Sequence, residues 1–148
     1  MSGDLDRALA ALTIANGAAA MGHRVTVFFT FWGLTVLRRP RRTAARRSLL
    51  QAAFCRLLPR GTRRLPLSRL NLAGLGPLLM RRVMRQRNIA SVEELLAAAR
   101  EQGVALVACT TSMEVLGLTR EELVDGVELA GVASYLGEAD GAAVNLFV

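Results

Sequence analysis

Cys109 is the residue whose type and position in this chain most clearly indicate chemistry. It closes the charge-free run 104–108 and is followed directly by Thr110, Thr111 and Ser112. The run before it is typical of a buried parallel strand, and the hydroxyl residues after it are typical of the start of a short helix. A thiol at that junction faces free backbone N–H groups and the positive end of a helix dipole, and both favour the reactive thiolate.

A buried, inert core cysteine is the alternative interpretation of Cys109, because free cysteines commonly pack in protein interiors. The reactive interpretation rests on position, since open α/β sheets keep their sites at the C-terminal tips of strands. Neighbouring residues exclude two other chemistries. A phosphatase loop needs an arginine six residues after the cysteine, where this chain has Val115, and no second cysteine is close enough in sequence for a C-x-x-C pair.

The composition limits the classes of protein to be considered. A chain of 148 residues fits one domain with a sizeable core, so we expect a single domain over 1–148. One histidine and two cysteines are too few for an ordinary zinc site, and we expect neither a metal nor another cofactor. Two cysteines also make no disulfide framework, which favours the cytoplasm. The charge-free stretches 8–23 and 25–37 are shorter than the about 20 residues of a membrane-spanning helix.

Basic residues are concentrated in one part of the chain. Fifteen of the nineteen arginines lie within 38–87, which contains no acidic residue, and we call this range the Arg-rich segment. We predict that it is an insert in the domain. Its charge is compatible with nucleic acid, an anionic membrane surface, an acidic protein partner or a solvated face. Phe54 is its only aromatic residue, which disfavours nucleic acid because single strands are bound by stacking.

The first half of the chain contains the patterns of three helices and a strand. We expect a helix over 5–22, a strand over 25–30 and two basic helices over 44–58 and 78–87, with a loop over 59–77. Three apolar residues of the second basic helix are expected to face inward: Leu79, Met80 and Val83.

The second half is more regular, because its helices begin with recognisable caps. Ser91 with Glu94 and Thr119 with Glu122 each have the spacing of a capping box. The expected elements are a helix from 91 to about 102, strands over 104–108, 127–130 and 144–148, and a helix over 132–139. Strands that alternate with helices predict an α/β fold, a Rossmann-like parallel sheet with helices on both faces.

The C-terminal tips of parallel strands share one edge of the sheet, which defines the candidate site. We expect Thr110, Thr111 and Ser112 to support an anion on Cys109. The wall of the site is predicted to be formed by three residues that follow other strands: Phe31, Trp32 and Gly131. Core packing is the alternative for Trp32, and Cys55 is expected to be an ordinary surface or core residue.

Several blocks of sequence match a known family. They include Ser2-Gly3-Asp4-Leu5-Asp6-Arg7-Ala8, Phe28-Phe29-Thr30-Phe31-Trp32-Gly33-Leu34, Ala108-Cys109 and Asp125-Gly126-Val127-Glu128. With these blocks the chain resembles the DsrE/DsrF/DrsH-like sulfur-relay family over nearly its whole length, and most closely the branch often labelled peroxiredoxin-like. The resemblance implies a Rossmann-like fold, homo-oligomers, and a persulfide carrier or sulfurtransferase-type protein. In it, Cys109 would take sulfur from a donor protein and pass it to an acceptor protein.

The chain departs from that family at its beginning. Members normally have a hydrophobic strand before the Ser-Gly-Asp turn, whereas this sequence starts at Met1-Ser2-Gly3. We therefore expect the first family strand to be missing. Either the true start lies upstream, or the sheet has a vacant position that exposes apolar neighbours. We also expect the chain to be poorly soluble. A non-catalytic, DsrE-like binding module on a membrane surface, acting through the Arg-rich segment, is the alternative function. A thiol peroxidase ranks third.

Overall fold

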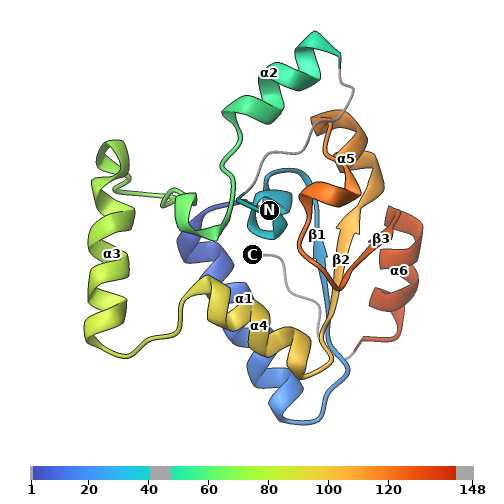
Figure 1. Ribbon diagram of the computed structural model, residues 1–148. Coiled ribbons are helices and arrows are strands. Elements are labelled where there is room, and N and C mark those ends of the chain that lie inside the picture. The colour runs from blue at the N-terminus through green and yellow to red at the C-terminus, as the bar shows by residue number, and fades with distance from the viewer. Residues whose placement is uncertain (1, 41–47, 143–148) are drawn as a thin grey trace.

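The fold is an α/β arrangement built on a parallel sheet, as the alternation of elements predicts. The computed structural model describes residues 2–40 and 48–142. Figure 1 shows three strands in the middle of the molecule: β1 (Thr26–Phe29), β2 (Ala105–Cys109) and β3 (Val127–Ala130). They lie in the order β1-β2-β3, and both pairs are parallel. The strand expected over 144–148 lies outside the described residues.

The register of the sheet brings the ends of its strands level with one another. Phe29 is opposite Ala108 at the end of β1, and Cys109 is opposite Ala130 at the end of β3. The strands β1 and β2 hydrogen-bond directly to each other, so the vacant position considered above does not lie between them.

One face of the sheet is covered by α1 (Leu5–Ala20) and α4 (Val92–Glu101), which pack against each other. Four residues of α1 at helical spacing are buried: Leu5, Ala8, Leu12 and Ala15. They share a core with Leu106 and Ala108 of the sheet. The capping box predicted for α4 is confirmed, because the N–H of Ser91 donates to Glu94 Oε2 at 2.7 Å and the N–H of Glu94 donates to Ser91 Oγ at 3.3 Å.

Helix α6 (Val132–Asp140) lies against the opposite face. The ring of Tyr135 stacks on Phe28 with centroids 4.8 Å apart. Successive side chains of a strand point to opposite faces, so Cys109 is on this side of the sheet together with Phe28, and Ala108 is on the side of α1. Helix α5 (Thr110–Leu116) begins directly after Cys109. Helices therefore lie on both faces, as expected.

The Arg-rich segment differs most from the sequence-based expectation. It contains α2 (Leu49–Leu57), the 3₁₀ turns η2 (Thr62–Arg64) and η3 (Leu72–Gly74), and α3 (Leu75–Gln86), which stands away from the sheet (Figure 1). The prediction that Leu79, Met80 and Val83 face inward is wrong, since these side chains are 57%, 40% and 50% exposed. The inward side of α3 carries Arg81, which donates to the carbonyl oxygens of Thr62 at 3.0 Å and Leu65 at 3.3 Å.

Two glycines provide a matched test of the packing at the N-terminus. A Cβ on Gly3 would lie 2.3 Å from both Thr35 Oγ1 and the carbonyl oxygen of Trp32, whereas a Cβ on Gly17 in α1 would meet nothing within 4 Å. We expect Gly3→Ala to lower the free energy of unfolding by about 1–3 kcal/mol through overpacking. Gly17→Ala should raise it by about 0.5–1 kcal/mol through helix propensity. Urea unfolding of both variants tests this, and equal effects would contradict the close N-terminal contact.

Candidate functional site

Cys109 lies where three strand ends meet. It is the last residue of β2 and the N-cap of α5. Thr30 comes directly after Phe29, which is opposite Ala108, so the register places Thr30 beside Cys109. Gly131 likewise follows Ala130, which is opposite Cys109. The structure therefore brings together the strand ends that the sequence predicted to meet.

The hydrogen bonds at the sulfur stabilise the thiolate of Cys109. Burial is the largest single influence and by itself would raise the pKa of the thiol. The N–H groups of Ser112 and Thr111 donate toward the sulfur. The hydroxyls of Ser112 and Thr30 supply one further donor between them, because the other hydroxyl donates across the contact between their oxygens, and together these bonds outweigh burial. The pKa of Cys109 therefore lies below its ordinary value. The Thr30 and Ser112 hydroxyl oxygens are also 2.7 Å apart, so the two side chains hold each other in place.

Two of the three residues predicted to support an anion on Cys109 act on its sulfur in the structure. Ser112 contributes its side chain and its N–H, and Thr111 contributes its N–H, but Thr110 is not among the described groups that lower the pKa of Cys109. Thr30 acts on the sulfur although it was not among the predicted site residues. The sequence shows only a hydroxyl residue at the end of a strand, and the register of β1 on β2 is what places it level with Cys109.

The three predicted wall residues lie at the same edge of the sheet. Phe31 and Trp32 begin the 3₁₀ helix η1 (Phe31–Leu37), which contacts α5 and β2, and their side chains are 47% and 48% exposed. Gly131 is the N-cap of α6, and a Cβ there would meet nothing within 4 Å. Their role as the wall of a site remains a prediction.

The sulfur itself is enclosed. Cys109 is only 2% exposed. Two cavities in the described part of the chain lie in the Arg-rich segment, and Cys109 lines neither of them. Within residues 2–40 and 48–142, no group of three or more His, Cys, Asp or Glu side chains is placed to hold a metal ion. The reactive group at this edge of the sheet is thus a hydrogen-bonded thiol, and the side chains that cover it must move before it can react.

The pH dependence of alkylation tests the hydrogen bonds to Cys109. The experiment uses Cys55→Ser protein and measures the rate of alkylation by iodoacetamide as a function of pH. The midpoint of the rate curve, its inflection, should lie at a lower pH for the folded protein than for the same chain unfolded in urea. Ser112→Ala removes one donor and should move the inflection to higher pH. Restricted access of the reagent to the sulfur lowers the rate by the same factor at every pH, whereas the pKa of the thiol sets the position of the inflection, so the two effects are separable. Equal inflections for folded and unfolded chains would contradict the account.

Comparison with known proteins shows the family of the chain. The profile of the DsrE/DsrF/DrsH-like family matches residues 1–147. The uncharacterized protein YrkE of Bacillus subtilis is 46% identical over 147 residues, which cover 99% of this chain and 92% of that protein. The sulfur carrier protein DsrE2 of Allochromatium vinosum is 30% identical over 154 residues, which cover 93% of this chain and 89% of the relative. Because the match spans nearly the whole chain, as the sequence resemblance indicated, the protein belongs to the DsrE/DsrF/DrsH-like family.

Proposed function

We propose that this protein is a sulfur-relay protein in which Cys109 carries sulfane sulfur as a persulfide. The observation that carries the proposal is the set of hydrogen bonds from Ser112, Thr30 and Thr111, which lowers the pKa of the thiol at the end of β2. A thiolate is the form that attacks sulfur. The name of the relative from Allochromatium vinosum, a sulfur carrier protein, supports the same role.

The relay consists of two balanced thiol exchanges. The thiolate of Cys109 attacks the outer sulfur of a donor persulfide, the donor's S–S bond breaks, and the donor leaves as a thiolate. The same hydrogen bonds then hold the terminal sulfur of the Cys109 persulfide, which is anionic after losing its proton to solvent. An acceptor thiolate attacks that terminal sulfur and releases Cys109 as a thiolate. No external oxidant or reductant is needed.

Partners in this relay are a sulfur donor protein and a sulfur acceptor protein, and the family implies homo-oligomers. Because Cys109 is buried, each exchange includes a step that uncovers the sulfur. The half-exposed rings of Phe31 and Trp32 lie at the same edge of the sheet, and we assign them to the cover that moves.

Loading with a small persulfide donor tests the proposal. The experiment uses Cys55→Ser protein, so that only Cys109 reports, and follows the intact mass after incubation with glutathione persulfide. We expect one adduct of about 32 Da, a single sulfur atom, mapped to the peptide that contains Cys109. The matched control is the Cys55→Ser/Cys109→Ser double variant, which should gain nothing. An equal adduct on the double variant, or none on the single variant, would overturn the proposal.

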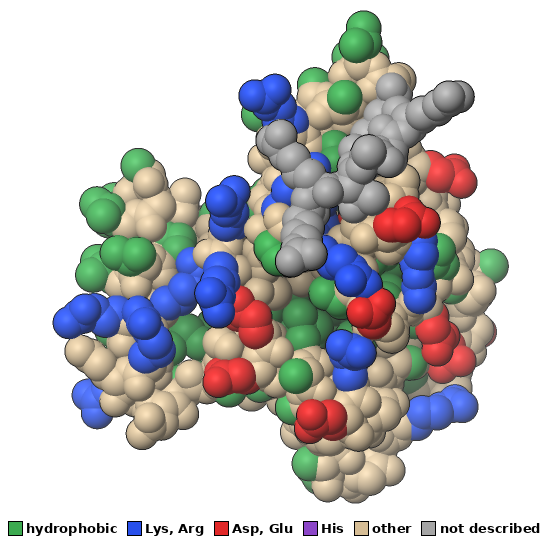
Figure 2. Space-filling model, viewed as in Figure 1, with side chains coloured by type: hydrophobic (Ala, Val, Ile, Leu, Met, Phe, Trp, Pro, Cys, Tyr) green, Lys and Arg blue, Asp and Glu red, His purple; other side chains and the backbone are tan. Residues whose placement is uncertain are grey.

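A second candidate function, association with an anionic membrane surface, is favoured by the exposed apolar faces of the Arg-rich segment. In α2, Leu49, Leu50 and Leu57 are 91%, 76% and 82% exposed. In α3, Leu79 and Val83 lie one turn apart and are flanked by arginines, and Figure 2 shows green and blue side chains side by side in this region. An apolar face bordered by arginines is the pattern of a helix that lies in the plane of a bilayer interface. No described helix is long and apolar enough to cross a membrane.

Vesicle flotation separates this candidate from a purely soluble relay. We expect the full chain to float with vesicles that contain anionic lipid and to stay at the bottom with neutral vesicles. Leu79→Gln/Val83→Gln should abolish flotation. Ile14→Gln, at a residue that is 48% exposed but lies on α1, is the matched control and should leave it unchanged. If flotation depends neither on lipid charge nor on the α3 substitutions, the apolar face of α3 is not a membrane-binding surface.

A further inference from the structure

A buried polar cluster joins the Arg-rich segment to the body of the fold. Residues 37–39 run beside 122–124: the N–H of Arg39 donates to the carbonyl oxygen of Glu122 at 2.7 Å, and the N–H of Val124 donates to that of Leu37 at 2.9 Å. This pairing brings Arg38 to Glu122, with Nη2 3.2 Å from Oε1. Both side chains are almost completely buried, at 0% and 1% exposure.

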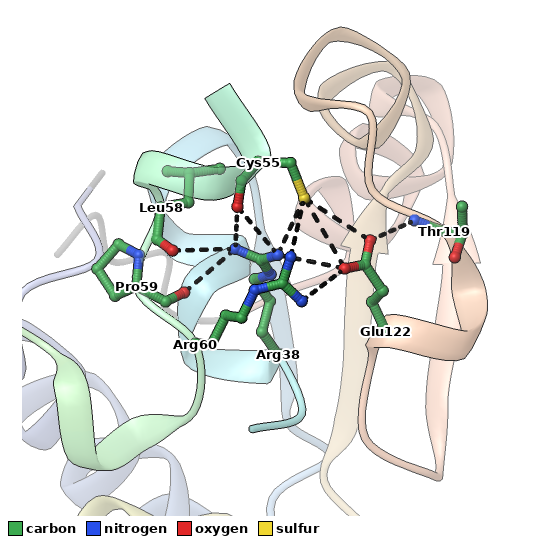
Figure 3. A network of polar contacts seen from close by, with 7 residues as sticks. All are labelled: Arg38, Cys55, Leu58, Pro59, Arg60, Thr119 and Glu122. Atoms are coloured by element: carbon green, nitrogen blue, oxygen red, sulfur yellow. Dashed lines mark hydrogen bonds and ion pairs between the residues drawn. The ribbon is translucent and has the colours of Figure 1, made fainter. Parts of the chain in front are cut away.

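The sulfur of Cys55 contacts the charged members of this cluster (Figure 3). Its sulfur is 3.0 Å from Arg38 Nη2 and 3.6 Å from Arg60 Nη2, and Cys55 is 1% exposed. Arg60 also donates to Glu122 Oε1 at 3.0 Å. The thiol thus contacts two guanidinium groups and one carboxylate.

Among the described residues, the formal charges of the cluster do not balance when the Cys55 thiol is neutral. Two guanidiniums, Arg38 and Arg60, face one carboxylate, Glu122. Buried charge is stable only when it is paired, and Arg38 additionally keeps its buried Nε without a hydrogen-bond partner. One further negative charge at or beside the sulfur would complete the pairing.

A basic cavity adjoins the cluster. It has a volume of about 480 Å³ and its lining includes three arginines, Arg56, Arg60 and Arg64. Arg60 belongs to both the cavity and the cluster, and its side chain is 13% exposed. Its guanidinium thus reaches from the cavity lining to within 3.6 Å of the sulfur of Cys55. An anion is the kind of ligand that such a lining attracts.

A purely structural role explains only part of this arrangement. Arg38 donates to carbonyl oxygens at the end of α2, those of Cys55 at 3.4 Å, Leu58 at 3.3 Å and Pro59 at 3.3 Å, so it anchors that helix. The anchor accounts for Arg38 and Glu122. It requires neither a thiol beside the two guanidiniums nor an arginine-lined cavity that ends at Arg60.

We propose that Cys55 is a second reactive thiol, which takes sulfur from small anionic sulfur compounds admitted through the Arg56–Arg60–Arg64 cavity. With an inorganic polysulfide, the Cys55 thiolate attacks one sulfur atom, the adjacent S–S bond breaks, and a polysulfide shorter by one sulfur leaves with both negative charges. Cys55 becomes an anionic persulfide, and the single negative charge that the thiolate brought to the cluster stays beside the two guanidiniums. This proposal does not depend on the role of Cys109.

Two thiol reagents that differ in charge test the proposal on Cys109→Ser protein, where Cys55 is the only thiol. Both are methanethiosulfonates, one with a sulfonate and one with a trimethylammonium tail. Each forms a disulfide with the thiolate and releases methanesulfinate. We expect the anionic reagent to modify folded Cys55 at least about tenfold faster than the cationic one. Salt at about 0.5 M should reduce this ratio, because it screens the arginines.

Substitutions in the cavity make the test specific. Arg56→Gln/Arg64→Gln should bring the two rates close together. Arg63→Gln is the matched control, since Arg63 neighbours Arg64 in sequence but pairs with Glu93 and does not line the cavity. Inorganic polysulfide should then add about 32 Da to Cys55 in Cys109→Ser protein. Equal rates for the two reagents, a preference for the cationic one, or modification of Cys55 only in urea would overturn the proposal.

Discussion

Glu122→Gln should remove about 3–5 kcal/mol from the free energy of unfolding, because it leaves buried Arg38 without its counter-charge. Arg60 loses the same partner. A glutamine keeps the shape of the side chain, so the loss reports charge rather than packing. The measurement is the urea midpoint and slope, followed by far-UV circular dichroism.

The neighbouring residue supplies the control for this prediction. Glu121 is exposed and adjacent to Glu122, and Glu121→Gln should change the free energy of unfolding by no more than about 0.5 kcal/mol. A loss for Glu122→Gln as small as that for Glu121→Gln would show that the buried ion pair does not hold the Arg-rich segment to the body.

The double substitution Thr30→Val/Ser112→Ala should slow sulfur loading of Cys109 by about ten- to hundredfold at a pH of about 6. It removes the one hydroxyl hydrogen bond that this pair directs at the sulfur, and a hydrogen bond to a charged group is worth about 1.5–3 kcal/mol. The two hydroxyls also bond to each other, so removing both leaves neither one unsatisfied. The sign follows from the pKa: without these donors the thiol binds its proton more tightly, and less thiolate is present at that pH. Loading rates by quenched intact-mass measurement in Cys55→Ser protein provide the test.

Thr110→Val is the matched control for the double substitution. The sequence pattern included Thr110 among the anion-supporting residues, but the structure does not place it among the groups that lower the pKa of Cys109. Thr110→Val should therefore load at the parent rate. A loss equal to that of the double variant would mean that general disturbance of the strand end, rather than the two hydroxyls, sets the rate.

The body of the fold was predictable because its signals are local. Ser91 and Glu94 fix the start of α4 through side-chain hydrogen bonds three residues apart, and the strand expected over 127–130 is β3 as found. The meeting of the strand ends followed from parallel topology alone. The contribution of Thr30 required the register of β1 on β2, which no local pattern specifies.

The Arg-rich segment was not predictable in the same way. Amphipathic spacing identifies two faces of α3 but does not say which one meets the protein. Here the inward face is chosen by Arg81 and the carbonyl oxygens of Thr62 and Leu65, which are brought close only by the tertiary fold. The pairing of Arg38 with Glu122 spans most of the chain, so an arginine that looked like surface charge is among its most buried residues.

The passage of sulfur through Cys109 is tested most directly by loading and discharge of one protein sample. Cys55→Ser protein is loaded with glutathione persulfide, freed of donor and then mixed with an excess of a small thiol while intact mass is recorded. We expect about 32 Da to appear on the peptide containing Cys109 and to be lost on mixing, with an equal amount of persulfide formed on the acceptor thiol. Sulfur that never binds at Cys109, or that stays there in the presence of the acceptor, would contradict a relay through this residue.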